Sequence, residues 1–385
     1  MNKGYSTPKV FVAACAGMSF FGMAMLSLAP ILGRLNELVE GANALPATMS
    51  LGILLGTVIF GPVVDRFGYK ALMIIASILA LAGVQGLANS QDINLLHVSI
   101  FCLGFGGGIL NGATNALASD IYDDDKRAGR IALVGAFYCI GALAWTFINL
   151  FTEDFTIPLN IVSVVMAASV VYFICIGFPA AKPAESVGLK KSLGLFRYPA
   201  LLLLAMVLFF ESGFEGAQGN FSALFMEKGK GLDATAAKLA MTLFTVGMVA
   251  GRLPLGKVLS RIGNLGALYA YLGTGLAGVL LLTFASATPI WAYIALTLIG
   301  FGIAATYPVI LNYVGSAFRE QSGTAMSIAL FIGLLGQFAC NRITGASFDA
   351  GAFWALPTLL VAAVACMMAI APVAVKSASK VKKKQ

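Results

Sequence analysis

Long apolar runs restrict this chain more than any other feature of its sequence. Four of them, at Val10–Leu32, Ala71–Ala88, Ile157–Phe178 and Leu265–Ala285, each approach the ~20 residues that a helix needs to cross a bilayer. Lipid offers backbone groups no hydrogen-bond partners, so such runs must be helical. Of the 385 residues, 59% are hydrophobic and 11% charged, too few charged side chains for a water-facing surface. The sequence therefore predicts an all-α membrane protein.

Twelve such runs are expected to span the membrane. They lie at 9–33, 45–65, 71–90, 96–119, 129–151, 157–178, 199–226, 234–258, 265–285, 289–317, 322–345 and 352–375. The first run is too long for a cleaved signal peptide, and Phe20 and Phe21 exclude a cleavage site of small residues there. We expect this run to remain as the first span.

The basic residues indicate the orientation. The net charge is +8, and if both termini are cytoplasmic, 19 of the 25 lysines and arginines fall in cytoplasmic segments. Such an excess normally marks the cytoplasmic side. We therefore expect a multi-pass protein of the cell's inner or plasma membrane with cytoplasmic N- and C-termini. A basic tail at 376–385 suits lipid headgroups or solvent, and no nucleic acid partner is expected.

The two halves of the chain share a pattern of glycines. A shift of 195 residues superimposes Gly52 on Gly247, Gly56 on Gly251, Gly61 on Gly256, Arg66 on Arg261 and Gly68 on Gly263. With six spans in each, the halves insert the same way up, as parallel repeats with a solute site expected between them. We predict an N-terminal six-helix bundle at 1–178, a cytoplasmic linker at 179–198 and a C-terminal six-helix bundle at 199–375.

The segment GPVVDRFGYK, between the second and third spans, is the most specific motif. Its residues Gly61, Asp65, Arg66, Gly68 and Lys70 fit the pattern G-x-x-x-D-R-x-G-x-R/K. This pattern resembles the signature loop of the major facilitator superfamily, and the resemblance implies that family's two-bundle fold and a gating role for these residues. The alternative is an ordinary tight turn with solvated charges.

A partial copy of the motif, GKVLSRIG, follows the eighth span. Gly256 and Arg261 are retained, and Ser260 replaces the aspartate. We assign Gly256, Arg261 and the preceding Arg252 to the same gating region. Arg252 alternatively extends its side chain to the cytoplasmic surface or pairs with a glutamate of span 7.

A second resemblance concerns the seventh span, FFESGFEGAQGNF. Its Gly213, Glu215, Gly219 and Phe221 are similar to the pattern of the fucose-permease-like sugar:proton symporters. This resemblance implies proton-coupled sugar import, with Glu215 as the acidic residue. The fucose permease also carries acidic residues in its first and fourth spans, where this chain has none before Asp120 at the end of span 4.

Glu211 and Glu215 are the ionisable residues near the middle of span 7. They are four residues apart and share a helix face with Gln218 and Ser222. Charged side chains are costly at this depth, and two neighbouring carboxylates are not expected to be ionised together. We therefore predict proton coupling through Glu215, supported by Glu211. Pairing of one glutamate with Arg252, which would only hold two helices together, is the alternative.

Amides and aromatic rings inside the spans suit a hydroxyl-rich solute. The predicted binding residues are Asn111, Asn115, Tyr138, Trp145, Gln218, Asn220, Tyr307, Asn312, Gln337 and Asn341. Interhelical hydrogen bonding is the alternative for these side chains. Arg342 could steer an anionic solute, or pair with Asp349.

Several functions lack their motifs. No phosphate-binding loop, nucleophile elbow or metal-ligand cluster is present, so we expect neither an enzyme nor a cofactor other than a coupling proton. The six cysteines all fall inside expected spans and are read as packing residues. We predict a monomeric secondary transporter that imports a sugar or similar small polar metabolite with protons by alternating access. An exporter or uniporter of an organic anion or drug-like solute, and a non-transporting membrane sensor, are the alternatives.

Overall fold

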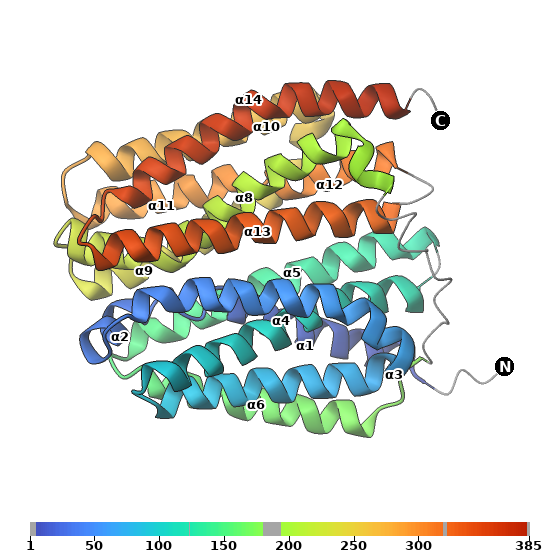
Figure 1. Ribbon diagram of the computed structural model, residues 1–385, viewed down its shortest axis with the longest axis horizontal. Helices are drawn as coiled ribbons and strands as arrows, with labels where there is room; N and C mark the ends of the chain where they lie inside the picture. Colours follow the sequence, from blue (N-terminus) through green and yellow to red (C-terminus); the bar gives the residue numbers. More distant parts are fainter. Residues whose placement is uncertain (1–4, 123, 180–193, 319–321, 383–385) are drawn as a thin grey trace. The chain divides into compact units, whose positions relative to one another are not determined.

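The computed structural model describes residues 5–122, 124–179, 194–318 and 322–382 (Figure 1). Within them, 12 helical segments are long and apolar enough to cross a membrane, which confirms the predicted all-α architecture and number of spans. In the first half the elements are α1 (Thr7–Met25), α2 (Leu32–Leu38), η1 (Ala42–Ala44), α3 (Leu45–Asn89), α4 (Ile93–Ile121), α5 (Asp124–Ile148), η2 (Asn149–Phe151) and α6 (Thr156–Cys175). In the second half they are η3 (Leu195–Arg197), α8 (Pro199–Leu224), η4 (Phe225–Gly229), α9 (Ala234–Arg252), α10 (Leu255–Phe284), α11 (Pro289–Ile303), α12 (Thr306–Ala317), α13 (Ser322–Asp349) and α14 (Ala355–Lys382).

The helices form two compact units, Met1–Ala184 and Glu185–Gln385. Six of the candidate spans lie in each unit. In the first unit α3 packs mainly on α4, and α1 packs on α4 and α5. In the second unit α8 packs on α13 and α14, and α9 on α11. Most of the predicted linker, residues 180–193, lies outside the described residues.

Two of the glycines that repeat in each half lie where helices contact each other. In each unit, a Cβ atom added at these glycines would collide with a backbone carbonyl oxygen of the neighbouring helix. The pairs are Gly52 on Phe101 and Gly56 on Phe105 in the first unit, and Gly247 on Thr297 and Gly251 on Phe301 in the second. Small residues allow such close approach in membranes, where packing rather than the hydrophobic effect holds helices together. The two units are therefore assembled by the same backbone contacts.

A second shared feature is a bend inside one helix of each unit. Helix α3 contains two spans and bends at Gly68, where φ is 77° and ψ is 168°. Helix α10 bends at Gly263, with φ of 73° and ψ of 169°. Residues with a side chain rarely adopt this conformation. The last glycine of the motif and of its copy thus makes the same bend in both units.

The predicted span 289–317 is not one continuous helix. Helix α11 ends at Ile303 and α12 begins at Thr306. Pro308 explains the interruption, because it has no N–H to donate to the carbonyl of Ala304 and its ring would clash with that carbonyl. In the first turn of α12 the missing N–H has no helical partner, so the proline is tolerated there.

Two further boundaries differ from the predicted ones. The span predicted at 234–258 ends with α9 at Arg252, and Pro254 separates it from α10, which contains Gly256. At the other end of the chain, α14 continues to Lys382, so residues 376–382 of the predicted tail are helical.

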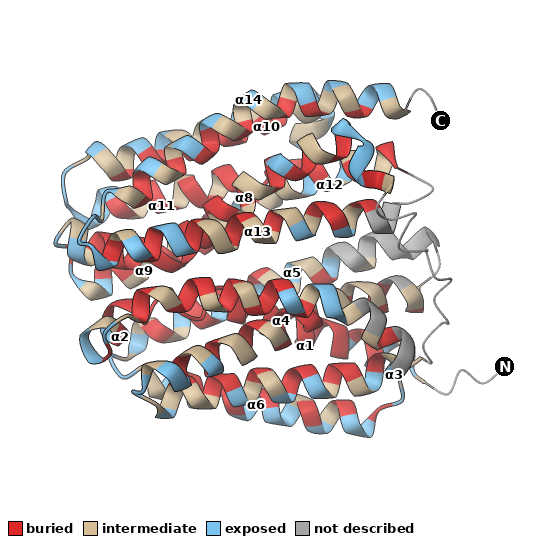
Figure 2. Ribbon diagram, in the orientation of Figure 1, coloured by how far each residue is buried: buried red, intermediate tan, exposed pale blue. Residues whose placement is uncertain are grey.

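Many apolar side chains lie on the exposed sides of the helices, where exposed residues alternate with buried ones (Figure 2). On α6, Val162 and Met166 are buried against other helices, while Ile161 and Val165 are 47% and 52% exposed. In a water-soluble protein the exposed side of a helix is normally polar. The exposed apolar side of α6 is the surface expected of a helix that faces lipid.

Candidate functional site

A buried carboxylate lies in the middle of α8. Glu211 is 2% exposed, and the hydroxyl of Ser212 donates a hydrogen bond of 3.1 Å to its Oε2. Glu215 follows one turn later on the same side of the helix and is half-buried. The two carboxyl groups interact electrostatically. They form the centre of a charged group inside the second unit.

Arg252 and Tyr307 are the other members of this group of interacting side chains. Arg252 lies in the last turn of α9, and Tyr307 is the second residue of α12. Glu211 interacts electrostatically with Arg252, and Tyr307 interacts with both glutamates and with the arginine. Arg252, which the sequence placed in the gating region, therefore offsets the negative charge of the glutamates within the same unit.

Several buried polar side chains of the second unit, Gln218 and Thr306 among them, have no hydrogen-bond partner within the described part of the chain. Gln218 of α8 is 0% exposed, and neither atom of its amide has a partner among the described residues. Thr306, the first residue of α12, is also 0% exposed, and its hydroxyl has no partner within the described part of the chain. An unsatisfied buried group of this kind costs about 1–3 kcal/mol. Such groups mark positions where a water or a solute can complete the hydrogen bonds.

Three further amides of this unit, those of Asn220, Gln337 and Asn341, lie on α8 and α13, which pack on each other. Asn220 is on the opposite side of α8 from Gln218, and its nitrogen donates a hydrogen bond of 2.8 Å to the carbonyl of Gly216. A Cβ atom at Gly216 would touch both Gln337 and Asn341 of α13. These two side chains are 1% and 0% exposed. The structure thus brings Gln337 and Asn341 beside α8, on a different side of that helix from the glutamates.

The candidates of the first unit form separate small groups. The side-chain nitrogen of Asn115 donates to the backbone carbonyl of Asn111 at 2.9 Å, one turn earlier in α4. The indole of Trp145 is 1% exposed and donates a hydrogen bond of 3.1 Å to the carbonyl of Ser27, beyond the end of α1. Tyr138 is half-buried in α5. Trp145 therefore makes the kind of interhelical hydrogen bond that was the alternative to solute binding.

Two predicted residues are not part of these groups. Asn312 of α12 and Arg342 of α13 are both exposed. The role considered for Arg342, steering an anionic solute or pairing with Asp349, therefore stays a prediction.

Two residues of the signature segment 61–70 join helices of the first unit. The ammonium group of Lys70 donates a hydrogen bond of 2.7 Å to the carbonyl of Ile174, in the last turn of α6. A cation is favourable at a helix C-terminus, where carbonyl groups lack partners. The hydroxyl of Tyr69 donates to Asp120 Oδ2 at 2.8 Å, which ties α3 to the end of α4. Sequence reasoning missed this pair, although Asp120 was noted as the acidic residue that ends span 4.

For the other residues of the motif and its copy, the described part of the chain shows no contact that bears on the predicted gating role. The side chains of Asp65 and Arg66, and the surroundings of Gly61, lie outside the described part of the structure. In the copy, Gly256 and Arg261 are exposed.

The described residues contain twelve apolar helical segments, six in each unit, and the units share glycine contacts and a bend. These features define a polytopic membrane protein built from two similar halves. The chain belongs to the Major Facilitator Superfamily, whose family model matches residues 10–340. It is therefore a transporter of this superfamily, as the signature motif predicted.

Similarity to individual proteins extends over most of the chain. An uncharacterized transporter of Sinorhizobium fredii, y4wD, is 23% identical over 349 residues, which are 86% of this chain and 90% of that protein. A solved structure of the nucleoside transporter NupG has a TM-score of 0.79 at 12% identity and covers 94% of this chain and 99% of its own. A D-xylose-proton symporter has a TM-score of 0.76 at 15% identity, with coverage of 93% and 96%. At these identities the structures show a shared fold.

Proposed function

We propose that this transporter imports a sugar or a similar small polar metabolite together with protons. The observation that carries the proposal is the carboxyl group of Glu211, 2% exposed within a span and next to the half-buried Glu215. Charged side chains are costly inside a span, and two neighbouring carboxyl groups are not expected to be ionised together, so the pair is suited to carrying a proton. Arg252 can instead stabilise the charged form when the proton has left.

The unsatisfied amide of Gln218 supports a hydroxylated solute. It follows Glu215 by one turn of α8, and an amide can donate to one hydroxyl group and accept from another. A solute bound there would lie next to the carboxyl groups, which gives a direct route for coupling. Sugars and nucleosides, the solutes named for the two transporters of similar fold, both offer hydroxyl groups.

The mechanism, the oligomeric state and the orientation are proposed from what is usual in the superfamily and from the distribution of basic residues. The two six-helix units alternate access to the solute, with the chain as a monomer in the inner or plasma membrane and both termini in the cytoplasm. The gating residues act on the cytoplasmic side, where Lys70 and Tyr69 join α3 to α6 and α4.

Transport in proteoliposomes tests the coupling. A thermal-shift screen of the purified protein against aldoses, nucleosides, amino acids and carboxylates first selects the solute, because a ligand of the native state raises the melting temperature. Glu215→Gln keeps the shape of the side chain but cannot release a proton. We expect this variant to lose accumulation driven by a pH gradient and to retain exchange of labelled for unlabelled solute.

Glu40→Gln, a substitution of an exposed glutamate in another part of the chain, is the matched control and should accumulate solute like the wild type. Accumulation at the wild-type level by Glu215→Gln would show that protons are not coupled through this residue. Loss of exchange as well would point to solute binding as its role.

A further inference from the structure

A cavity lies at one end of the first unit, away from the buried glutamates. Its volume is about 410 Å³, and three elements line it: α2 with Arg34, Leu35 and Leu38; the end of α3 and the turn after it, 88–91; and the beginning of α6 with the turn before it, 153–156. This volume is in the range of small-molecule sites. None of the transport residues discussed above lines it.

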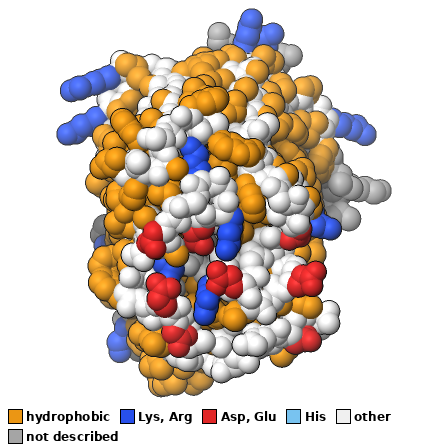
Figure 3. All heavy atoms as spheres, turned by 90° about the vertical axis from the view of Figure 1, so that its left-hand side faces the viewer, with side chains coloured by type: hydrophobic (Ala, Val, Ile, Leu, Met, Phe, Trp, Pro, Cys, Tyr) orange, Lys and Arg blue, Asp and Glu red, His pale blue; other side chains and the backbone are white. Residues whose placement is uncertain are grey.

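The cavity is lined by a basic residue on one side and by two acidic residues on another. Arg34 on α2 is the basic residue of the lining, and Glu153 and Asp154 supply carboxylates from the turn before α6. Figure 3 looks onto this end of the helices, where acidic and basic side chains both reach the surface. Two carboxylates and one guanidinium, carried by separate elements, are complementary to a group that bears a positive and a negative charge.

Both kinds of charge have hydrogen-bonding capacity to spare. Arg34 Nη1 donates one bond of 2.7 Å to Glu37, and a guanidinium has five N–H groups. Asp154 Oδ1 accepts from the hydroxyl of Thr156 at 2.7 Å and from its backbone N–H at 2.9 Å. These hydrogen bonds lower the pKa of Asp154, so its carboxylate is charged at neutral pH. The turn is thereby fixed with a negative charge at the cavity.

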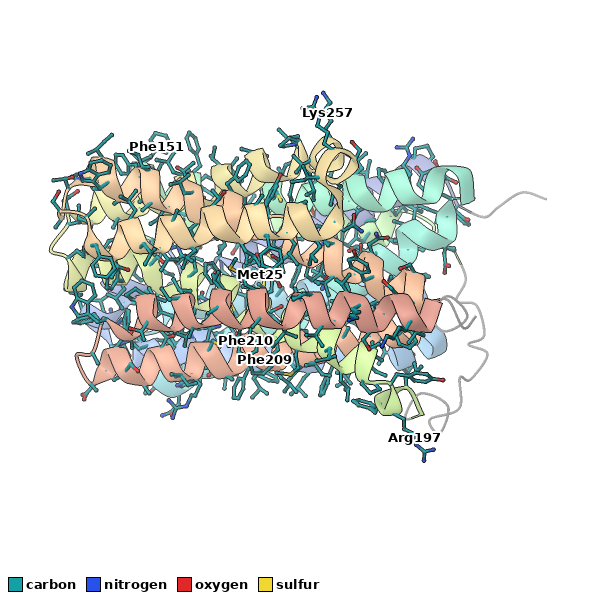
Figure 4. The ribbon with its side chains drawn as sticks, turned by 90° about the horizontal axis from the view of Figure 1, so that it is seen from above. Met25, Phe151, Arg197, Phe209, Phe210 and Lys257 are labelled. Carbon is teal, nitrogen blue, oxygen red and sulfur yellow. The ribbon has the colours of Figure 1, made fainter. Side chains whose placement is uncertain are left out.

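The surroundings of the cavity are those of a membrane interface. Leu38 in its lining is 44% exposed, and Ile157, directly after the lining residue Thr156, is 52% exposed. Ile161, one turn further along α6, continues this apolar surface at 47% exposure. Phe151, 74% exposed, projects outward at the same end of the molecule (Figure 4). A ligand in the cavity therefore has an apolar surface beside it that leads along α6 toward the bilayer interior.

We propose that this cavity binds the headgroup of a zwitterionic phospholipid that carries a primary ammonium, as in phosphatidylethanolamine. The phosphate lies against Arg34, the ammonium donates to Glu153 and Asp154, and an acyl chain follows the exposed side of α6. A primary ammonium has three N–H donors, whereas the trimethylammonium of phosphatidylcholine has none, so the site prefers the first lipid. A lipid with a phosphate but no ammonium, such as phosphatidylglycerol, binds least because the carboxylates repel it.

Native mass spectrometry of the full chain, titrated with each of these three lipids, tests the order of affinity. We expect phosphatidylethanolamine to be retained best, and Glu153→Gln to weaken its binding about two- to fivefold and to narrow its advantage over phosphatidylcholine. Arg34→Gln should weaken both lipids, which share the phosphate. Glu40→Gln, at the same end of the unit but outside the lining, is the matched control and should leave binding unchanged.

The proposal is overturned if phosphatidylethanolamine and phosphatidylcholine bind equally, or if Glu153→Gln binds phosphatidylethanolamine as tightly as Glu40→Gln does. Soluble glycerophosphoethanolamine separates the two possible sources of the same headgroup. If it raises the melting temperature of lipid-free protein as much as the lipid does, the site takes a soluble zwitterion and the assignment to a membrane lipid is wrong. These readouts do not involve transport, so they remain valid if proton coupling fails its own test.

Discussion

At the scale of single residues, glycines decide how closely the helices pack. A Cβ atom at Gly336 of α13 would collide with the carbonyl oxygen of Phe209 in α8 (Figure 4 labels Phe209). A backbone group cannot move aside as a flexible side chain can. This contact therefore fixes the distance between the helix that carries the glutamates and its neighbour.

We expect Gly336→Ala to destabilise the protein by about 1–3 kcal/mol, because the added methyl group overfills a contact with backbone atoms. Gly273→Ala is the matched control, since Gly273 is also inside a helix and a Cβ there meets nothing within 4 Å. Thermal unfolding in detergent should show a lower melting temperature for the first variant and an unchanged or higher one for the second. Equal melting temperatures would show that the helices separate without cost.

The sequence predicted which residues share one side of α8 better than it predicted which residues of other helices lie near them. Spacing alone placed Glu211, Glu215 and Gln218 on one side of a helix. Arg252 was considered as a partner of the glutamates, but the sequence could not rank this above a gating role, because the pairing depends on how α9 packs beside α8. Thr306 was not predicted, since its lack of a hydrogen-bond partner follows from the break between α11 and α12.

At the scale of elements, two glycines of α10 allow the cost of an unfavourable backbone conformation to be measured separately from steric clashes. Gly256 and Gly263 both lie in this helix, both are exposed, and a Cβ atom at either position meets nothing within 4 Å. They differ in backbone conformation, because φ is positive at Gly263. Any difference between their alanine variants must come from the backbone.

Gly263→Ala should therefore destabilise the protein by about 1–3 kcal/mol or straighten the bend. Gly256→Ala should be neutral or stabilising by up to about 1 kcal/mol, because alanine favours helix. Urea or detergent unfolding of both variants measures the difference. If Gly263→Ala were as stable as Gly256→Ala, the left-handed conformation would not be required at this position.

Element boundaries were predicted least well where proline acts within an apolar run. Hydropathy treats 289–317 as uniform, but Pro308 divides it into α11 and α12, and Pro254 ends the preceding pattern earlier than expected. Pro372 nevertheless lies inside the continuous helix α14. Neighbouring helices can compensate for a lost hydrogen bond, so the sequence alone does not reveal which proline interrupts a span.

At the scale of the whole molecule, the distribution of basic residues predicts the orientation. Ser286 follows the end of α10, whereas Ser379 lies near the end of α14, and both are exposed. With cytoplasmic termini, a cysteine at Ser286 in a cysteine-free background should react with an impermeant thiol reagent added outside intact cells. A cysteine at Ser379 should react after the membrane is opened. The reverse pattern would invert the assigned topology.

The number of spans and the similarity of the two halves could be predicted because each follows from a pattern in the sequence itself. Runs of apolar residues define the spans, and Gly52 and Gly247, which the shift superimposes, each meet a carbonyl oxygen of the neighbouring helix. The cavity lined by Arg34 and Glu153 could not be predicted, because its walls come from three elements distant in the chain.

The backbone contacts of the glycines also bear on how such a protein can evolve. When a glycine rests on a carbonyl group, the distance between two helices is set by atoms that every residue possesses, and the side chains around the contact are free to change. Mutations can then accumulate along both helices without shifting them, provided that the glycine remains. A few such contacts per unit can preserve an architecture long after overall identity has fallen below recognition. Transporters of this kind can thus acquire new solutes by exchanging neighbouring side chains while their framework stays the same.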